Sequence, residues 1–426
     1  MFPYIGGSHM GAEPQRRRAP VSVSAEETSV SGNDAESASF ESHGMASSGF
    51  EMNGLEHWEA QEYGARSFAK PLANQGPQAK LRKPLRVIVV FPCLLRGGAE
   101  QWLVYLAKFL DPQRAIIDRC IVTNSKAIDP QFAKEMPIPV EVRQPGSIDR
   151  AVRECDVLFV FGLPLDTLLE KSRPKLCVFT AHGCGNWTKG LLERSHGLYD
   201  HVVAVSNNVK SATCAGIPTT VISNGIDAAR IAATRSRSSA RQRFGFQDAD
   251  FVLGYMGRFS PEKQVHLLIR AAAKLPSRYK LLLVGWGPER PMLMDLANEL
   301  IPGRYAFATA VDYLGDYYGA MDAFGLVSLM EGCSLALLEA MMSRVPVVVT
   351  AVGSVPELIV DGTSGIVVSA NPSSIAKAAR RLGEHPEWAS ALAGEGQRIA
   401  NQQGHAARMA REYETLLHKL WHKKFG

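Results

Sequence analysis

The sequence lacks the patterns that mark several large classes of protein. Its seven cysteines are scattered, without the paired or histidine-rich spacing of a disulfide framework or a zinc site. No apolar run is as long as a membrane span, and no signal peptide opens the chain. The formal net charge is only +5, which does not suggest a nucleic-acid binder. We therefore expect a soluble, cytoplasmic protein, and leave open a peripheral contact with the inner face of a membrane.

The sequence also lacks an Asp-x-Asp metal motif at a useful position and a complete dinucleotide-binding fingerprint. The only Asp-x-Asp sequence, Asp248-Ala-Asp250, directly precedes an expected core strand, so we interpret it as a capped loop and expect no metal site. The three-glycine fingerprint of dinucleotide-binding proteins is absent, because Gly97-Gly98 and Gly285-Trp-Gly287 each lack the third glycine. The sequence thus predicts chemistry without a metal ion or a bound cofactor.

A chain of 426 residues is too long to fold around one ordinary hydrophobic core, which points to two domains with additional segments. Residues 1–80 are poor in branched apolar residues and rich in Ser, Ala, Glu and Gly, which indicates a disordered tail. Within this tail, Gly7-Ser-His-Met10 resembles a vector-derived scar of recombinant expression. We exclude the tail from the expected fold.

From Leu85 onward, short buried strands alternate with helical patterns, which is typical of parallel α/β sheets covered by helices on both faces. A Gly-containing turn at Ser223–Asp227 separates two such sets, so we expect two facing, doubly wound Rossmann-like domains over residues 81–224 and 225–404. Ligands of open α/β sheets bind beside the carboxyl ends of the strands, which predicts a cleft between the domains. An amphipathic helix over residues 405–426 follows.

The most informative segment is Glu331-Gly-Cys-Ser-Leu-Ala-Leu-Leu-Glu339, which places two carboxylates eight residues apart. An apolar strand precedes it and apolar residues at helical spacing follow, so the segment spans a loop and the start of a helix. Ser334 is the expected N-cap of that helix. The unpaired N–H groups and positive dipole end of such a start suit an anionic or hydroxyl-rich ligand. The alternative is that both glutamates are solvated surface residues.

Two cations flank another strand-to-helix junction. Arg258 stands just past the strand expected to end at Met256, and Lys263 follows Pro261 at the next helix start. Cations at this spacing around a helix amino terminus form a phosphate site that needs no metal. Solvated surface cations are the alternative, because that is the usual fate of Arg and Lys.

Two further candidates lie nearer the amino terminus. Gly97 and Gly98 follow the first expected strand, where paired glycines permit a close approach of backbone to ligand. A simple strand-to-helix turn is the alternative there. His182 ends an apolar strand next to Gly183 and can reach the same edge of the sheet, although a lone histidine is more often structural.

Four segments, taken in order, resemble the nucleotide-sugar-binding half of the family 4 glycosyltransferases, which are retaining enzymes with the two-domain GT-B fold. These segments are Gly257–Lys263, Leu283–Glu289, Glu331–Glu339 and Gly353–Glu357. The resemblance covers about residues 85 to 420 and is densest in the carboxyl-terminal half. It implies that residues 81–224 bind the acceptor, that residues 225–404 bind the nucleotide sugar, and that the helix over 405–426 packs back on the first domain.

The resemblance also implies a role for each candidate residue. Arg258 and Lys263 would hold the donor diphosphate, Glu331 would lie at the donor sugar, and Glu339 would hold the ribose hydroxyls. His182 would touch the sugar near the reacting carbon. The remaining donor contacts would come from Gly97 and Gly98 beside the phosphate, from the backbone of Cys333, Ser334 and Leu335 at the sugar, and from the backbone of Ala310 and Val311 at the base.

This sequence departs from the family pattern at two places. Cys333-Ser334 stands where many members have Phe-Gly or a Pro-containing pair, which leaves the donor sugar open. Thr309 stands where many members have Gly, which leaves the base open, and uridine diphosphate is favoured only because it is common in the family.

We therefore expect a metal-independent, retaining glycosyltransferase that moves a hexose from a nucleoside diphosphate sugar to the hydroxyl of a sugar, lipid-linked or small-molecule acceptor. The nearest alternative is a GT-B sugar-nucleotide epimerase, which would turn over its donor without an acceptor. A nicotinamide-dependent Rossmann oxidoreductase is a second candidate, which the missing glycine fingerprint disfavours. A noncatalytic protein that binds sugar nucleotides is a third.

Overall fold

The protein is described by a computed structural model that covers residues 83–426 apart from 145–146, 170–171, 196, 215 and 310–312. The expected tail over residues 1–80, with its expression scar, lies outside the described residues. The described residues belong to one compact unit that runs from Lys80 to Gly426. The boundary drawn at residues 224/225, between two domains within that unit, stays a prediction.

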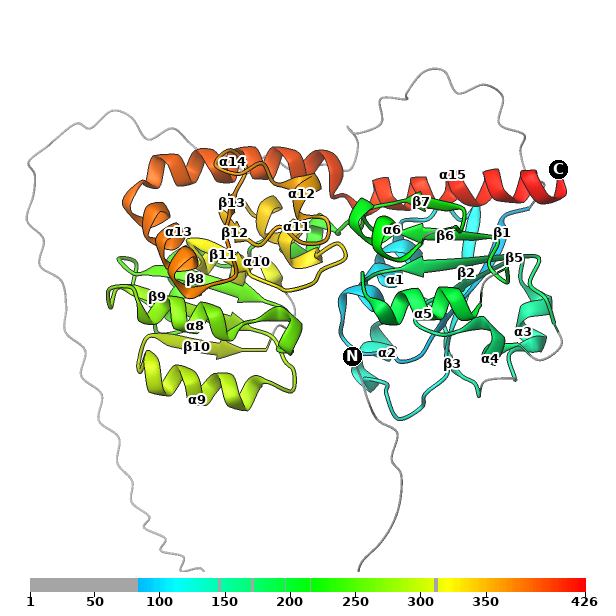
Figure 1. Ribbon diagram of the computed structural model, residues 1–426, viewed down its shortest axis with the longest axis horizontal. Helices are drawn as coiled ribbons and strands as arrows, with labels where there is room; N and C mark the ends of the chain where they lie inside the picture. Colours follow the sequence, from blue (N-terminus) through cyan, green and yellow to red (C-terminus); the bar gives the residue numbers. More distant parts are fainter. Residues whose placement is uncertain (1–82, 145–146, 170–171, 196, 215, 310–312) are drawn as a thin grey trace, which may run out of the picture. The chain divides into compact units, whose positions relative to one another are not determined.

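The first sheet has seven strands in the order β3-β2-β1-β4-β5-β6-β7, and every pairing in it is parallel (Figure 1). Its central strands are continuous apolar runs because helices cover both faces of the sheet. The strands are β1 (Leu85–Phe91), β2 (Ala115–Val122), β3 (Val140–Val142), β4 (Val157–Val160), β5 (Leu176–Ala181), β6 (His201–Ala204) and β7 (Thr219–Val221).

The second sheet has six strands in the order β10-β9-β8-β11-β12-β13, again paired in parallel. Its strands are β8 (Phe251–Met256), β9 (Tyr279–Val284), β10 (Tyr305–Ala308), β11 (Ala323–Leu326), β12 (Val347–Val349) and β13 (Ile366–Val367). The sequence-based expectation of two sets of parallel strands with interleaved helices is therefore confirmed.

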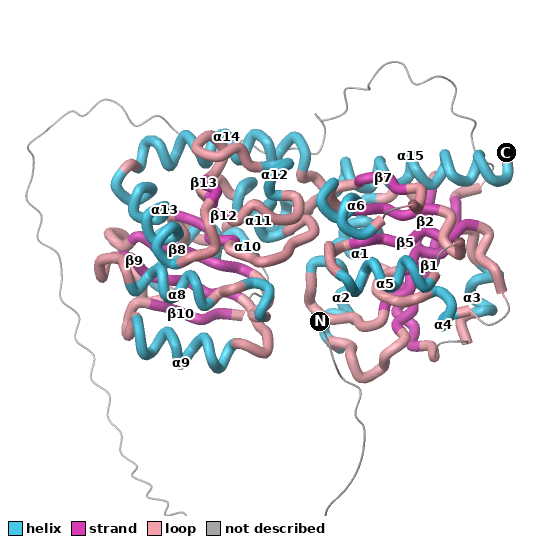
Figure 2. Tube along the Cα trace, viewed as in Figure 1, coloured by secondary structure: helices cyan, strands magenta, loops and turns pink. Residues whose placement is uncertain are grey.

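Helices connect successive strands in both sheets (Figure 2). Those of the first sheet are α1 (Gly98–Phe109), α2 (Pro130–Glu135), α3 (Asp149–Glu154), α4 (Leu165–Leu168), α5 (Asn186–Arg194) and α6 (Asn207–Thr213). Those of the second part are η1 (Ala228–Ile231), α7 (Arg237–Gln242), η2 (Pro261–Lys263), α8 (His266–Ala273), α9 (Arg290–Leu300), α10 (Leu314–Ala320), α11 (Leu335–Met342), α12 (Val355–Leu358), α13 (Pro372–Glu384), α14 (Pro386–Gln403) and α15 (Ala406–Phe425).

The chain passes between the two sheets twice, and the two passages run side by side. Ile226 donates its N–H to the carbonyl of Gly404 at 2.7 Å and accepts from the N–H of Ala406 at 2.9 Å. A side chain at Gly225 would meet the backbone of His405, because its Cβ would lie 2.4 Å from that carbonyl oxygen. Beyond this crossing, α15 packs against α1 of the first sheet, with Tyr413 fully buried.

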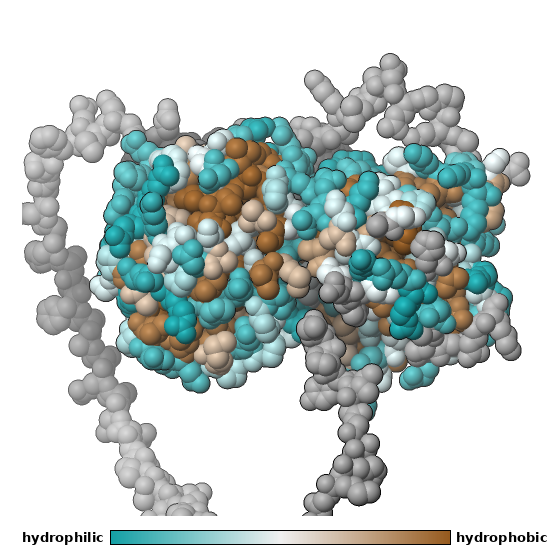
Figure 3. Space-filling model, in the orientation of Figure 1, coloured by the Kyte–Doolittle hydropathy of each residue, from teal (hydrophilic) through white to brown (hydrophobic). Residues whose placement is uncertain are grey.

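Large buried clusters of apolar side chains surround both sheets. Figure 3 shows hydrophobic residues gathered over the region of β12 and β13 on the face of the molecule that it presents. None of the described helices is both long enough and apolar enough to cross a membrane.

Candidate active site

Lys263 and Glu331, which the sequence assigned to the diphosphate and to the sugar, form an ion pair. Lys263 ends η2 after β8, and Glu331 lies in the loop between β11 and α11. The Lys263 Nζ is 2.8 Å from the Glu331 Oε1, and the Ser328 hydroxyl donates to the same oxygen at 2.7 Å. The Leu329 N–H also donates to the Glu262 carbonyl at 2.7 Å, which joins the two loops. The two oppositely charged side chains are therefore held together by contacts of both loops.

Arg258 lies at the same edge of the second sheet, just past β8. Its guanidinium stacks over the ring of Trp286, with 5.3 Å between the guanidinium carbon and the ring centroid. The loops after β8 and β9 approach so closely that a Cβ at Gly285 would lie 1.8 Å from the Gly257 carbonyl oxygen. Gly285 therefore serves the packing of two loops, and this packing fixes the strand end from which Arg258 projects.

The start of α11 is built as the sequence predicts. The Ser334 hydroxyl accepts from the Leu337 N–H at 3.3 Å, so the expected N-cap is confirmed. Asn224 donates its side-chain amide to the Cys333 carbonyl at 2.9 Å, and Leu335 is the first residue of the helix. This contact ties the helix start to the passage between the sheets.

The end of β5 meets the loop that carries Glu331. Cys184 donates its thiol to the Glu331 carbonyl at 3.2 Å. A Cβ at Gly332 would lie 2.0 Å from the His182 carbonyl oxygen, so only glycine fits at this contact. The structure therefore brings together two segments that the sequence singled out separately, one from each sheet.

The His182 side chain lies among aromatic rings. Its ring centroid is 4.9 Å from that of Trp102 and 5.2 Å from that of Phe161, both edge-on. Burial lowers the pKa of His182 to about 3. Its Nε2 has no hydrogen-bond partner among the described residues. A neutral imidazole in this setting can exchange a hydrogen bond with a ligand, but it does not carry a charge near neutral pH.

The first turn of α1, which follows the glycine loop after β1, contains a buried carboxylate that the sequence analysis did not assign. Gly97 is the N-cap of α1, and the Glu100 side chain folds back toward it, so that a Cβ at Gly97 would lie 2.5 Å from the Glu100 Oε2. Glu100 is 7% exposed, and burial raises its pKa to about 7, an effect that the nearby Arg258 guanidinium opposes. The first-turn position of Glu100, two residues after the glycine pair, was the available signal, because such a glutamate often reaches back to cap its own helix.

Glu339 is buried inside the second part of the protein. It is 5% exposed, and the Tyr318 hydroxyl donates to its Oε2 at 2.8 Å. Burial raises the pKa of Glu339, while the Arg230 guanidinium and the Tyr318 hydroxyl lower it. Arg230 and Tyr318 are two further residues that the sequence analysis did not assign.

Ala310 and Val311, the expected contacts of the base, lie outside the described residues. The residue before them, Thr309, accepts a hydrogen bond at its carbonyl from the Tyr317 hydroxyl at 3.1 Å. Among the described residues, no group of three or more His, Cys, Asp or Glu side chains is arranged to hold a metal ion.

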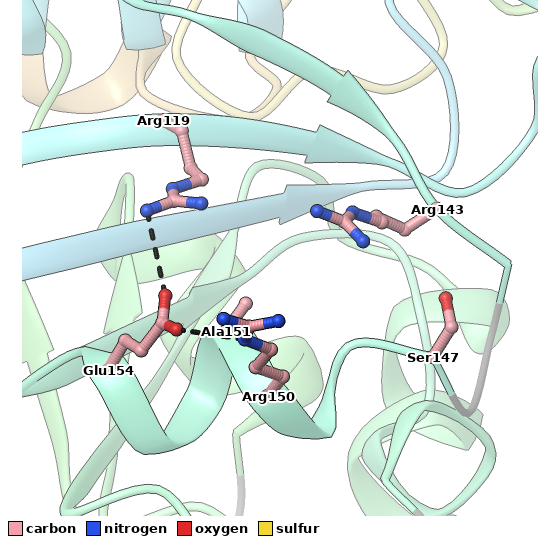
Figure 4. Close-up of a pocket in the computed structure, with 6 residues that line it drawn as sticks. All are labelled: Arg119, Arg143, Ser147, Arg150, Ala151 and Glu154. Carbon is pink, nitrogen blue, oxygen red and sulfur yellow. Dashed lines mark hydrogen bonds and ion pairs between the residues drawn. The ribbon is translucent and has the colours of Figure 1, made fainter.

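A pocket of about 230 Å³ lies elsewhere in the first sheet, between β2, β3 and α3 (Figure 4). Its lining consists of Arg119, Arg143, Ser147, Arg150, Ala151 and Glu154. Glu154 pairs with Arg119 and Arg150, and Glu141 pairs with Arg119 and Arg143. Carboxylates thus compensate most of the charge of this pocket, and its lining includes no residue that the sequence assigned to the donor.

Two curated proteins illustrate what this chain is similar to. LpsB, a lipopolysaccharide core biosynthesis mannosyltransferase of Rhizobium meliloti (strain 1021), is 29% identical over 248 residues, which cover 54% of this chain and 69% of LpsB. The N-acetyl-alpha-D-glucosaminyl L-malate synthase of Bacillus anthracis is 27% identical over 195 residues, which cover 45% of this chain and 51% of that enzyme. The chain thus spans about half to two-thirds of the length of these relatives.

Among solved structures, HepE of Anabaena in complex with UDP and glucose matches with a TM-score of 0.68 at 22% identity, covering 78% of this chain and 99% of HepE. This likeness confirms the expected GT-B fold. The family model described as Glycosyltransferase Family 4 matches residues 96–230, and the model described as Glycosyl transferases group 1 matches residues 250–385. Because the two models together match more than half of the chain and take in most of both sheets, the chain belongs to the family 4 glycosyltransferases, a family of transferase enzymes.

Proposed function

We propose that this protein is a retaining, metal-independent glycosyltransferase that moves a hexose from a nucleoside diphosphate sugar, with uridine diphosphate favoured, to an acceptor hydroxyl. The observation that carries the proposal is the Lys263–Glu331 ion pair at 2.8 Å. Arg258 lies just past the end of β8, on the same side of the pair in sequence as Lys263, and α11 begins four residues after Glu331. This arrangement offers two cations and a helix amino terminus to a diphosphate, and a carboxylate to the sugar.

The chemistry asks the site to stabilise a departing diphosphate. Negative charge grows on the leaving oxygens as the bond to the anomeric carbon breaks, and Arg258 and Lys263 would stabilise that charge. Lys263 would exchange part of its contact with Glu331 for the phosphate oxygens. The released carboxylate would then face the positive charge that develops on the sugar.

A neutral His182 fits the same step. Its unpartnered Nε2 could accept a hydrogen bond from a sugar hydroxyl without adding charge beside the reacting carbon. We assign no nucleophile that attacks the sugar from the opposite face. We therefore infer a front-face substitution, in which the departing phosphate takes the proton of the acceptor hydroxyl and the anomeric configuration is retained.

The similarities support a nucleotide-sugar donor but do not choose the acceptor. HepE is solved in complex with UDP-glucose, and LpsB is named a mannosyltransferase of lipopolysaccharide core biosynthesis. For this chain we propose a sugar, lipid-linked or small-molecule acceptor held by the first sheet. The same-fold alternative is a sugar-nucleotide epimerase.

The test is to incubate the protein with uridine, guanosine and adenosine diphosphate sugars, with and without a panel of acceptors, and to measure nucleotide release. We expect release that depends on an acceptor, and proton NMR should show an α-linked product from an α-linked donor. Donor turnover without an acceptor would favour the epimerase, and a β-linked product would overturn the front-face mechanism. The Lys274→Ala variant, at the exposed end of α8, is a control for changes of surface charge.

A further inference from the structure

The segment Gly353–Glu357 packs against the loop that carries Glu331. It runs from the loop after β12 into α12 and is one of the four segments that carry the family resemblance. The Ser354 N–H donates to the Gly332 carbonyl at 2.9 Å. Gly353 has a φ of +58°, and a Cβ there would lie 2.6 Å from the carbonyl oxygens of both Glu331 and Gly332. Glycine is therefore required where this segment supports the backbone of the Glu331 loop.

The same loop also contacts the first sheet. A Cβ at Gly332 would lie 2.0 Å from the His182 carbonyl oxygen and 3.1 Å from a methyl group of Val205. Val205 directly follows β6, and β6 pairs in parallel with β5, with Ala204 beside Ala181. The backbone at Gly332 is therefore in contact with the ends of two neighbouring strands of the first sheet and with the segment after β12 of the second.

Glu357 connects these two parts of the protein directly. Its Oε1 accepts the backbone N–H of Asn207 at 2.8 Å, and its Oε2 accepts the Asn207 side-chain amide at 3.2 Å. Asn207 is the first residue of α6 and comes two residues after Val205, and Glu357 comes three residues after Ser354. The connection therefore lies within three residues of the contacts at Gly332 on both sides. Asn207 is exposed and Glu357 is only partly buried, so the connection is not part of the hydrophobic core.

We propose that Glu357 is a positioning residue for the transfer reaction, which holds the start of α6 and thereby keeps the end of β5 against the Glu331 loop. The proposal rests on the proposed function, in which His182 and Glu331 meet the donor sugar from different sheets. A carboxylate that accepts two hydrogen bonds from one residue fixes both the distance and the orientation of its partner. Because a displacement of about 1 Å can slow a reaction by roughly 10²-fold, even a small loss of alignment between the sheets should lower kcat.

Asn207→Asp breaks this connection without shortening a side chain. The new carboxylate would face Glu357 in the position from which the amide now donates, so two like charges would repel each other. Adding Glu357→Gln restores a complementary pair, because the glutamine amide donates to the aspartate while its oxygen still accepts the backbone N–H. Asn208→Asp, which places the same charge on the exposed next residue of α6, is the matched control.

Steady-state kinetics and calorimetry with UDP give the first test. We expect Asn207→Asp to lower kcat by about tenfold, less than the cost of a displacement of a full ångström. The double variant Asn207→Asp/Glu357→Gln should recover most of this loss, and Asn208→Asp should show none. UDP affinity should change little in every variant, because Arg258, Lys263 and Glu339 all belong to the second part of the protein.

Four results would overturn the proposal. They are an unchanged kcat in Asn207→Asp, a loss of kcat that the double variant does not rescue, an equal loss in Asn208→Asp, and a loss of UDP affinity as large as the loss of kcat.

A second measurement requires no ligand. The Cys184 thiol donates to the Glu331 carbonyl at 3.2 Å, so its alkylation by N-ethylmaleimide reports whether the end of β5 stays on the Glu331 loop. Peptide mass spectrometry should show faster alkylation of Cys184 in Asn207→Asp, and the wild-type rate in the double variant and in Asn208→Asp. Cys214, the buried C-cap residue of α6, should keep its wild-type rate in all of them, because α6 itself stays folded.

The two measurements distinguish a failure of this inference from a failure of the proposed function. If the alkylation of Cys184 follows the expected pattern but the wild-type protein transfers no sugar, the proposed function is wrong and the role of Glu357 in holding β5 stands. If the alkylation of Cys184 is unchanged in Asn207→Asp, or if that of Cys214 rises with it, Glu357 does not position β5, whatever reaction the protein catalyses.

Discussion

The two sheets give their candidate site residues opposite electrostatic surroundings. In the first sheet, burial lowers the pKa of His182 to about 3 and raises the pKa of Glu100 to about 7, so that it favours the neutral form of both side chains. In the second sheet, Lys263 and Glu331 face each other at 2.8 Å and compensate one another. The first sheet thus favours uncharged groups and the second supplies the charges, which is the division expected where an acceptor hydroxyl meets a charged donor.

The largest expected effect comes from removing a charge on the second sheet. Lys263→Ala should slow transfer by roughly 10²-fold or more, because it removes stabilisation that grows as the diphosphate departs. It also removes the cation that pairs with the buried Glu331 carboxylate, so the variant should unfold at a lower temperature than the wild-type protein. Steady-state kinetics on protein shown to be folded by circular dichroism checks this prediction.

Two further variants test whether the loss of activity is specific to the diphosphate site. Arg258→Ala should lose activity to a similar extent without breaking the ion pair, while the exposed control Lys274→Ala should retain normal turnover. Near-normal turnover in both Lys263→Ala and Arg258→Ala would show that these cations do not hold the diphosphate. The electrostatic difference between the two sheets would then have no role in the reaction.

A smaller effect should follow from the buried carboxyl of the first sheet. The folded pKa of Glu100 is about 7, raised from 4.5, so its contribution to stability is present below about pH 4.5 and is lost as the pH rises to about 7. A shift of this size corresponds to roughly 3 kcal/mol. Glu100→Gln cannot titrate, so its free energy of unfolding should fall less than that of the wild-type protein between pH 5 and pH 8.

Urea unfolding at the two pH values measures this difference. Glu384→Gln, at the exposed end of α13, is the matched control and should keep the wild-type slope. If the slopes of the wild-type protein and Glu100→Gln are identical, Glu100 is charged at pH 5 in the folded protein, and the first sheet does not favour neutral groups as we describe.

The smallest effect is expected from metal removal. Arg258, Lys263 and the start of α11 would carry the charge compensation that a metal ion provides in other enzymes. EDTA should therefore leave most of the transfer activity. An activity that disappears with EDTA and returns only with manganese or magnesium would contradict this. It would show that the cations of the second sheet do not stabilise the departing diphosphate without a metal ion.

The repetitive features of the fold could be predicted from the sequence. The continuous apolar runs at Val87–Phe91 and Phe251–Met256 lie within or coincide with β1 and β8, and Ser334 caps α11, because run length, periodicity and capping are local properties. The edge strand β3 was not predicted, since two of its three residues are only partly buried, the third is exposed, and the three carry no clear pattern. Short edge strands depend on their neighbour for their conformation.

The arginine-rich segment from Arg235 to Arg243 shows a different limit. Its polar, arginine-rich composition predicts a surface helix start or loop, and α7 does begin at Arg237. Within this helix, however, Arg241 is 2% exposed and donates to the carbonyls of Asp248 and Asp250 at 2.9 and 3.0 Å. The helix start was therefore predictable from the sequence, whereas the burial of Arg241 was not. A guanidinium is buried only where several acceptors converge on it, and the carbonyls that do so are set by the tertiary fold.

The candidate site was predictable as a set of residues, but not as a set of contacts. Lys263 and Glu331 were both singled out, yet their pairing joins residues 68 apart in the sequence. Arg230 and Glu100 were not assigned, because what distinguishes each is burial beside a group on another element. Sequence patterns report which side chains are unusual for their local structure. Glu100 gave only the weak local signal of its first-turn position, and Arg230 becomes unusual only after the sheets have formed.

The account depends most directly on the different roles of the two carboxylates in the second part of the protein. Calorimetry with UDP on Glu331→Gln and Glu339→Gln separates them, since both substitutions keep the shape of the side chain and remove its charge. Glu339→Gln should weaken UDP binding, because the bare nucleotide already contains the ribose, whereas Glu331→Gln should bind UDP almost normally and lose kcat with the complete donor. Normal affinity in Glu339→Gln together with lost affinity in Glu331→Gln would contradict the account.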